Sequence, residues 1–162
     1  MNIRSTRILV VDDYEPWRRF ERLTFLGRED LQIVGECSDG EDAIQKADEL
    51  KPDLVLLDIS LPTLNGIEAA RRIQQVSPNC KILFVSENRS PDIAEEALKT
   101  GAGGYVVKSE AAGELLPAIK AVLEGKRFIS ASLAGHFLLA ATLTVAQTAH
   151  LSLIMTLLSG LG

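Results

Sequence analysis

Short apolar runs alternate with longer segments of helical periodicity, and the pattern repeats five times before the composition changes. The runs predict five strands, at residues 7–11, 31–37, 54–57, 81–86 and 104–108. The run at 54–57 is apolar throughout, as expected for a central parallel strand that helices cover on both faces. Strands that alternate with helices in this way predict an α/β fold with a parallel sheet.

The first predicted helix begins at Pro16, a residue suited to the first turn of a helix. Its apolar positions are Trp17, Phe20, Leu23 and Phe25. Capping and stop residues mark the ends of the later helices at Asp39, Ser90–Pro91 and Gly125. We therefore expect one globular domain at residues 1–130, followed by a linker and tail at 131–162.

Length and composition narrow the class of protein. A chain of 162 residues with 46% hydrophobic residues can bury one good core. The net charge of −5 provides no basic surface, so we expect no direct nucleic-acid binding by this chain. The first apolar run is too short for a secretory signal, and Cys37 and Cys80 stand singly in apolar runs. These features predict a cytoplasmic protein with reduced thiols.

Polar side chains stand at the carboxyl ends of four of the five predicted strands. Asp12 and Asp13 follow the first strand, Asp58 follows the third, Ser86 closes the fourth and Lys108 closes the fifth. Open parallel sheets bind ligands at this edge. Taken singly, each residue has a simpler explanation, because aspartate and serine cap helices and a strand-end lysine reaches solvent. Three carboxylates that meet in one crevice, however, repel one another unless they share a cation.

Carboxylates without a neighbouring histidine or thiolate favour a hard ion such as Mg²⁺. Lys108 would then supply a positive charge opposite Asp58, and the Ser86 hydroxyl could donate to a phosphoryl oxygen. The set suits phosphoryl transfer to a carboxylate. Glycosidase-like acid–base chemistry is disfavoured because aromatic residues make up only 5% of the chain. The turn DDYEPW contains no glycine, which excludes a glycine-rich nucleotide-binding loop after the first strand.

Four motifs carry a resemblance to a known family: ILVVDD, LVLLDISLPTLNGIEAARRI, ILFVS and GAGGYVVKS. In order and spacing they resemble the receiver domain of two-component response regulators, in particular the NarL/LuxR-type branch, over about residues 6–130. The resemblance implies a flavodoxin-like, doubly wound sheet of five strands. It also implies a signalling switch rather than an enzyme with a separate substrate, since a receiver catalyses only its own phosphorylation and dephosphorylation.

The resemblance also assigns roles to residues. It implies that Asp58 accepts a phosphoryl group from a sensor histidine kinase. Mg²⁺ would be held by Asp13, Asp58 and the backbone carbonyl of Ser60, with Asp12 assisting. Lys108 would balance the charge of the phosphorylated site.

A conformational switch is implied as well. Ser86 would move toward the phosphoryl group, and the ring of Tyr105 would fill the space that it leaves. The face around the fourth and fifth helices would repack. Apart from the switch, a homodimer through that face or through the tail is a candidate partnership of this chain. Glu87 departs from the small residue usual after Ser86, and we expect its charge to slow phosphorylation by small-molecule donors.

Two rival functions remain open. A pseudo-receiver would act as a binding scaffold without phosphorylation, and a truncated transcription regulator would lack its helix-turn-helix output domain. Intact Asp13, Asp58, Ser86 and Lys108 favour the phosphorylated switch over the scaffold.

The tail from Leu138 to Gly162 contains no Asp, Glu, Lys or Arg. Thr144, Thr148, Ser152 and Thr156 recur every four residues and predict an uncharged amphipathic helix. Self-association or docking on the receiver is therefore preferred, ahead of a remnant of an output domain and a membrane span. For His136 and His150 we expect no chemical role, because neither has a ligand-spaced partner.

Overall fold

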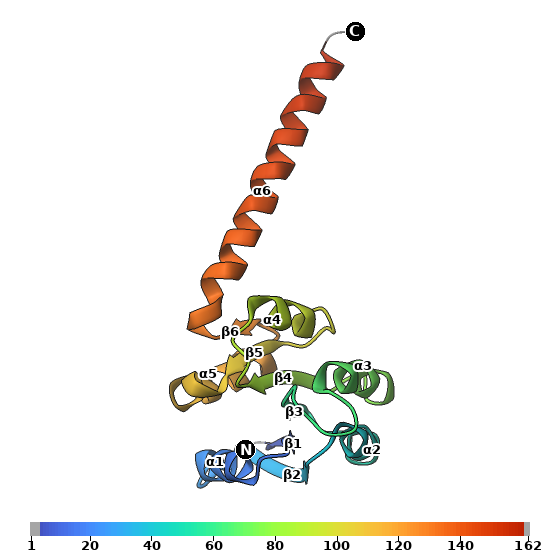
Figure 1. Cartoon of the computed structure of the whole chain (residues 1–162), viewed down its shortest axis with the longest axis vertical. Helices are drawn as coiled ribbons and strands as arrows, with labels where there is room; N and C mark the ends of the chain where they lie inside the picture. The colour runs from blue at the N-terminus through green and yellow to red at the C-terminus, as the bar shows by residue number, and fades with distance from the viewer. Residues whose placement is uncertain (1–3, 161–162) are drawn as a thin grey trace. The chain divides into compact units, whose positions relative to one another are not determined.

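The computed structural model describes residues 4–160, and the chain divides into two compact units, Met1–Ser130 and Ala131–Gly162 (Figure 1). The first unit is a parallel sheet in the order β2-β1-β3-β4-β5-β6. Its strands are β1 (Thr6–Val11), β2 (Leu31–Cys37), β3 (Leu54–Leu57), β4 (Lys81–Ser86), β5 (Gly104–Val107) and β6 (Phe128–Ile129). The strand order changes direction between β1 and β3, which is the doubly wound, flavodoxin-like arrangement.

The prediction of five strands was wrong by one. The additional strand, β6, has only two residues and pairs in parallel with Gly104 and Tyr105 of β5. The hydroxyl of Ser130 accepts a hydrogen bond from the Val107 backbone N–H at 2.7 Å and fastens the end of this strand. Two residues are too few to show an apolar alternation, so the pattern gave no sign of β6.

Five helices connect the strands, and α1 and α5 lie on one side of the sheet while α2 and α3 lie on the other (Figure 1). Their bounds are α1 (Glu15–Phe25), α2 (Gly40–Leu50), α3 (Gly66–Val76), α4 (Pro91–Leu98) and α5 (Ala111–Leu123), the last preceded by the short 3₁₀ helix η1 (Lys108–Glu110). The side chain of Asp39 caps α2 by accepting from the Asp42 N–H at 2.8 Å.

The core lies on both faces of the central strands. All four residues of β3 are buried, as their apolar run predicted. In α1 the buried positions are Glu21 and Phe25, whereas Leu23 is 58% exposed. The predicted apolar face of this helix was therefore wrong at Leu23, which is exposed. The buried face includes Glu21 instead.

The second unit is one helix, α6 (Ala131–Ser159), as expected for the tail. Its 29 residues would extend about 43 Å at 1.5 Å per residue. By length and composition it is the one helix among the described residues that could cross a membrane, which on its own is weak evidence of a span. Hydroxyl groups along it donate to carbonyls of their own helix, from Thr142 to Leu138, from Thr148 to Thr144 and from Thr156 to Ser152.

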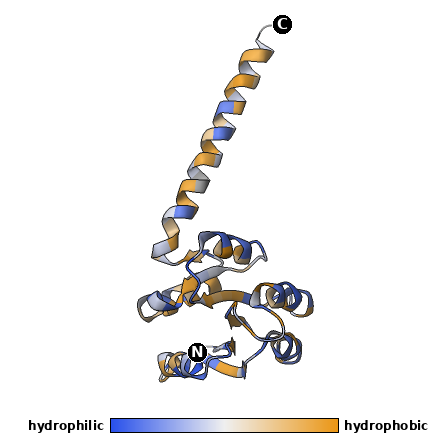
Figure 2. Cartoon of the chain, in the orientation of Figure 1, coloured by the Kyte–Doolittle hydropathy of each residue, from blue (hydrophilic) through white to orange (hydrophobic). Residues whose placement is uncertain are grey.

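The predicted separation of polar and apolar faces on α6 is not found. Polar and apolar residues alternate along the whole helix (Figure 2). At 100° per residue, Gln147 and His150 fall on the side of Leu143, while Val145 and Met155 fall on the side that carries the threonines. The hydroxyl residues do recur every four positions, but they cover only part of the circumference of the helix.

Candidate functional site

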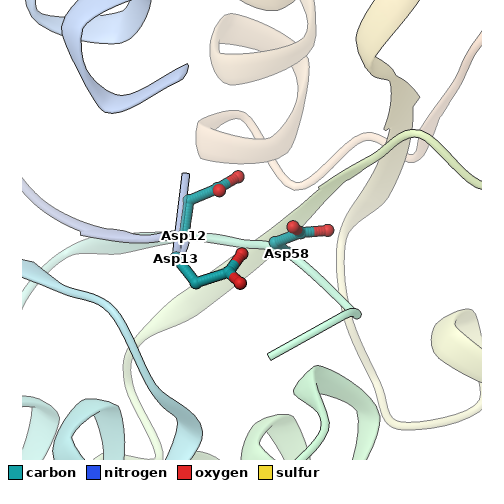
Figure 3. Close-up of side chains that lie close together, drawn as sticks. All are labelled: Asp12, Asp13 and Asp58. Atoms are coloured by element: carbon teal, nitrogen blue, oxygen red, sulfur yellow. The ribbon is translucent and has the colours of Figure 1, made fainter. Parts of the chain in front are cut away.

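Three carboxylates meet at the carboxyl ends of β1 and β3. These strands are neighbours, with Val11 opposite Leu57, so Asp12, Asp13 and Asp58 leave the sheet side by side. One carboxylate oxygen from each lies within 4.8 Å of the others (Figure 3). The sequence prediction that these three residues converge is therefore met by the geometry.

Backbone N–H groups hold two of the carboxylates in place. Asp12 accepts a hydrogen bond from the Tyr14 N–H at 2.9 Å, and Asp58 accepts one from the Ile59 N–H at 2.7 Å. Both side chains are buried, while Asp13 is exposed. Each bond uses the Oδ1 oxygen and leaves Oδ2 directed to other partners.

Lys108 supplies the positive charge of the site. Its Nζ lies 2.6 Å from Asp12 Oδ2 and 3.3 Å from Asp58 Oδ2, and its side chain is only 8% exposed. Burial alone would lower the pKa of Lys108, but the hydrogen bond to Asp12 and the charges of Asp58 and Asp12 outweigh it and raise the pKa. The lysine is thus held in its charged form.

One lysine does not balance three carboxylates. Burial raises the pKa of Asp58 to about 6; Lys108 works against this rise and the charge of Asp12 adds to it. A carboxylate held in this way gains from a further cation, and three convergent oxygen ligands without histidine or thiolate suit Mg²⁺. The donor set therefore fits the predicted metal.

A cavity of about 420 Å³ opens over these groups. It is lined by Asp13, Tyr14, Asp58, Ser60, Ser86, Glu87, Asn88 and Lys108. The predicted site residues Ser60 and Ser86 thus face the same space as Asp58, and so does Glu87. A phosphoryl group would have to enter through this cavity to reach Asp58.

Tyr105 lies behind the cavity rather than in it. Its ring is fully buried, and its hydroxyl donates to the Asn88 carbonyl at 2.8 Å. The Ser86 hydroxyl accepts from the N–H of the same Asn88 at 3.1 Å. Asn88, which the sequence did not single out, therefore joins the two residues of the predicted switch.

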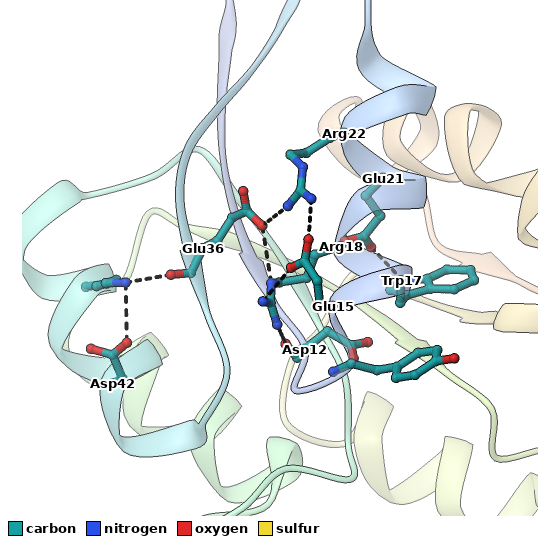
Figure 4. A network of polar contacts seen from close by, with 10 residues as sticks. Asp12, Glu15, Trp17, Arg18, Glu21, Arg22, Glu36 and Asp42 are labelled. Atoms are coloured by element: carbon teal, nitrogen blue, oxygen red, sulfur yellow. Dashed lines mark hydrogen bonds and ion pairs between the residues drawn. The ribbon is translucent and has the colours of Figure 1, made fainter.

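A second group of residues, which the sequence prediction missed, surrounds Asp12 from α1 (Figure 4). Arg18 donates to the backbone carbonyl of Asp12 at 2.6 Å and also contacts Glu15 and Glu36. Glu21 lies buried one turn further along and accepts from the indole N–H of Trp17 at 3.0 Å. The signal for Glu21 was its position four residues from both Trp17 and Phe25, on the same helical face.

Fold and site together define a flavodoxin-like α/β domain with an acidic centre and a lysine at the carboxyl ends of its strands. The family model described as "Response regulator receiver domain" matches residues 8–120, and the chain belongs to that family. Receiver domains generally bind Mg²⁺ at an acidic cluster of this kind and are generally not metabolic enzymes.

Curated relatives and solved structures agree with this assignment. The chain is 36% identical over 128 residues to the response regulator GacA of Pseudomonas viridiflava, covering 79% of this chain and 60% of GacA. It is 32% identical over 129 residues to the transcriptional regulatory protein DegU of Brevibacillus brevis, covering 80% and 55%. The chain thus spans little more than half the length of these relatives.

Among solved structures, a LuxR-family two-component response regulator from Aurantimonas sp. superposes with a TM-score of 0.77 at 36% identity, covering 82% of this chain and 94% of that one. The isolated REC domain of RcsB from Salmonella enterica serovar Typhimurium, in the presence of the phosphomimetic BeF₃⁻, gives a TM-score of 0.75 at 25% identity, with coverage of 81% and 97%.

Proposed function

We propose that this chain is a phosphorylation-controlled switch that accepts a phosphoryl group from a sensor histidine kinase on Asp58. The observation that carries the proposal is the position of Asp58: a buried carboxylate at the end of β3, 3.3 Å from the Lys108 ammonium and beside Asp12 and Asp13. Membership of the receiver family supports the same role.

In the proposed reaction a carboxylate oxygen of Asp58 attacks the phosphorus of the donor phosphohistidine. The new O–P bond forms as the P–N bond breaks, and the donor imidazole leaves with the electron pair. Lys108 offsets the negative charge that accumulates on Asp58 and the phosphoryl oxygens, and the Ser86 hydroxyl donates to one of those oxygens. Catalysis is mainly positioning and charge neutralisation, as in other phosphoryl transfers.

We assign the metal site to Asp13, Asp58 and the Ser60 carbonyl, with Asp12 assisting. Mg²⁺ bound there neutralises charge on the transferred phosphoryl group and on the acidic cluster. The chain's own part is to hold Asp12 and Asp58 by the N–H groups of Tyr14 and Ile59, so that both carboxylates stay in place while the ligand enters.

The proposed switch runs through Asn88. When Ser86 turns toward a phosphoryl oxygen, its hydroxyl leaves the Asn88 N–H, and the Tyr105 ring moves into the vacated space and pulls on the Asn88 carbonyl that it binds. The loop before α4, which contains Asn88, repacks as a result. The proposed output is homodimerisation, through the α4–α5 face or through α6. We further propose that the protein is cytoplasmic and that this chain does not itself bind nucleic acid.

The proposal is tested by intact-mass spectrometry after incubation with acetyl phosphate and Mg²⁺. We expect one phosphoryl adduct, which is absent with EDTA and absent in Asp58→Asn. Asp48→Asn, which removes an exposed carboxylate from α2, serves as the matched control and should retain the adduct. If neither acetyl phosphate nor a histidine kinase gives an adduct, and beryllofluoride does not bind, the scaffold function replaces the switch.

A further inference from the structure

The ammonium group of Lys108 has a third neighbour besides Asp12 and Asp58. It lies 5.0 Å from the centroid of the Trp17 ring, within the range of a cation–π contact. A ring face attracts the cation without using a directional hydrogen bond. Of the three donors on the ammonium, two point to carboxylates, and the third remains available to an incoming phosphoryl oxygen.

The Trp17 ring is itself held by a buried acid. Its indole N–H donates to Glu21 Oε1 at 3.0 Å, and Glu21 is 1% exposed. The second carboxyl oxygen, Oε2, has no hydrogen-bond partner among the described residues. Burial raises the pKa of Glu21 to about 8, although the hydrogen bond from Trp17 acts against the rise.

A buried carboxyl group with one unpaired oxygen destabilises the fold compared with an apolar side chain of similar size. Glu21 lies between Trp17 and Phe25 on the inner face of α1, where a leucine would pack without that cost. Within the described part of the chain, what Glu21 provides and a leucine cannot is the hydrogen-bond acceptor for the indole N–H. Phe20 also packs on the ring, in a tilted arrangement with 4.7 Å between centroids, so two neighbours on α1 hold the indole.

We propose that Trp17 is a positioning residue for Lys108, and that Glu21 acts through Trp17 by fixing the orientation of the indole. The ring face stabilises the ammonium without using one of its donors, so Lys108 stays within reach of Asp58 instead of being drawn wholly to Asp12. This inference deepens the proposed function and rests on it. Among the described residues, Glu21 accepts its side-chain hydrogen bond from Trp17 and interacts with Asp12, Lys108 and Asp58 only through their charges. Glu21→Gln removes the carboxylate charge and keeps an acceptor for the indole, so it separates the two effects.

The experiment compares the free energy of unfolding with the rate of phosphorylation by acetyl phosphate in four variants. Glu21→Leu removes the acceptor, Glu21→Gln keeps one, and Trp17→Leu removes the ring. Phe25→Leu, a buried change on the same face away from Lys108, is the matched control. We expect Glu21→Leu to be at least as stable as the wild type, yet phosphorylated about three- to tenfold more slowly, in keeping with the strength of a desolvated cation–π contact.

Trp17→Leu should be slowed to a similar degree, and Glu21→Gln should recover most of the rate. Phe25→Leu should lose stability and keep its rate within about twofold. The proposal is overturned if Glu21→Leu and Trp17→Leu react at the wild-type rate, or if rates follow stability across all four variants.

A resting-state measurement separates this inference from the proposed function. In Glu21→Leu the ring is still present, so a change in its orientation alters the ring-current shift of the Lys108 ε-methylene protons in NMR spectra. We expect that shift to decrease. If the wild type proves not to be phosphorylated, the shift still tests the positioning of Lys108, and an unchanged shift would reject it.

Discussion

The Lys108 ammonium lies closer to Asp12 than to the residue proposed to be phosphorylated, at 2.6 Å from Asp12 compared with 3.3 Å from Asp58. Asp12 therefore holds the lysine more closely than Asp58 does. The charge of Asp12 also raises the pKa of Asp58, in addition to the larger effect of burial.

Asp12→Asn should consequently lower the pKa of Asp58 below its value of about 6 in the absence of metal. The substitution removes a repelling charge and frees Lys108 to bond to Asp58. Titration of the Asp58 carboxyl carbon by NMR measures this directly, with Asp48→Asn as the control for a lost distant charge. A pKa that stays the same or rises would contradict the described balance of charges.

Glu21 should make the fold less stable as the pH rises. Its pKa is about 8 in the folded state and near 4.5 in the unfolded chain, so between these values the folded state holds a proton that the unfolded state has lost. The free energy of unfolding is unaffected by this group below about pH 4.5 and falls progressively up to about pH 8, by at most about 1.4 kcal/mol per pH unit.

Urea unfolding at several pH values, for the wild type and for Glu21→Gln, isolates this contribution because the other titrating groups are shared. The free energy of unfolding should fall more steeply with pH in the wild type. If the two curves of unfolding free energy against pH run parallel, the pKa of Glu21 is the same in the folded and the unfolded state.

Glu87 lines the cavity through which a donor must pass. Acetyl phosphate is anionic, so Glu87→Ala should be phosphorylated faster, by about two- to fivefold at low ionic strength, with the difference shrinking as added salt screens the charge. The rate of adduct formation at two salt concentrations checks this. If Glu87→Ala is phosphorylated no faster than the wild type, Glu87 does not slow the reaction.

The exposed leucines of α6 predict self-association. Leu151, Leu153 and Leu157 are each about 60% exposed in this unit, and no charged residue interrupts them. Sedimentation velocity should show a concentration-dependent oligomer that Leu153→Glu disrupts, while Gln45→Glu, the same charge on α2, leaves it intact. Partition of the chain into membranes after alkaline washing would favour a membrane span instead.

The sequence was sufficient to predict the acidic centre, because parallel strands place their carboxyl ends along one edge. Asp12, Asp13, Asp58 and Lys108 each follow or close a strand, so predicting the strands also predicted where these residues meet. The roles of these residues, and of Ser60, Ser86 and Tyr105, stay predictions.

What sequence reasoning missed depends on tertiary packing. Glutamate is usually exposed on helices, and it is the packing of α1 in the folded domain that buries Glu21. The strand β6 exists because two residues happen to lie beside β5, not because of any pattern of their own. Asn88 contributes through its backbone groups, which no side-chain pattern reveals.

The most direct test of the central claim is to locate the phosphoryl group. Borohydride reduces an acyl phosphate of aspartate to homoserine, which peptide mass spectrometry can place at a single residue. After phosphorylation with Mg²⁺, we expect homoserine at position 58 alone, and none when EDTA is present. Homoserine at Asp12 or Asp13, or a phosphoryl adduct that survives in Asp58→Asn, would contradict the assignment of Asp58 as the phosphoacceptor.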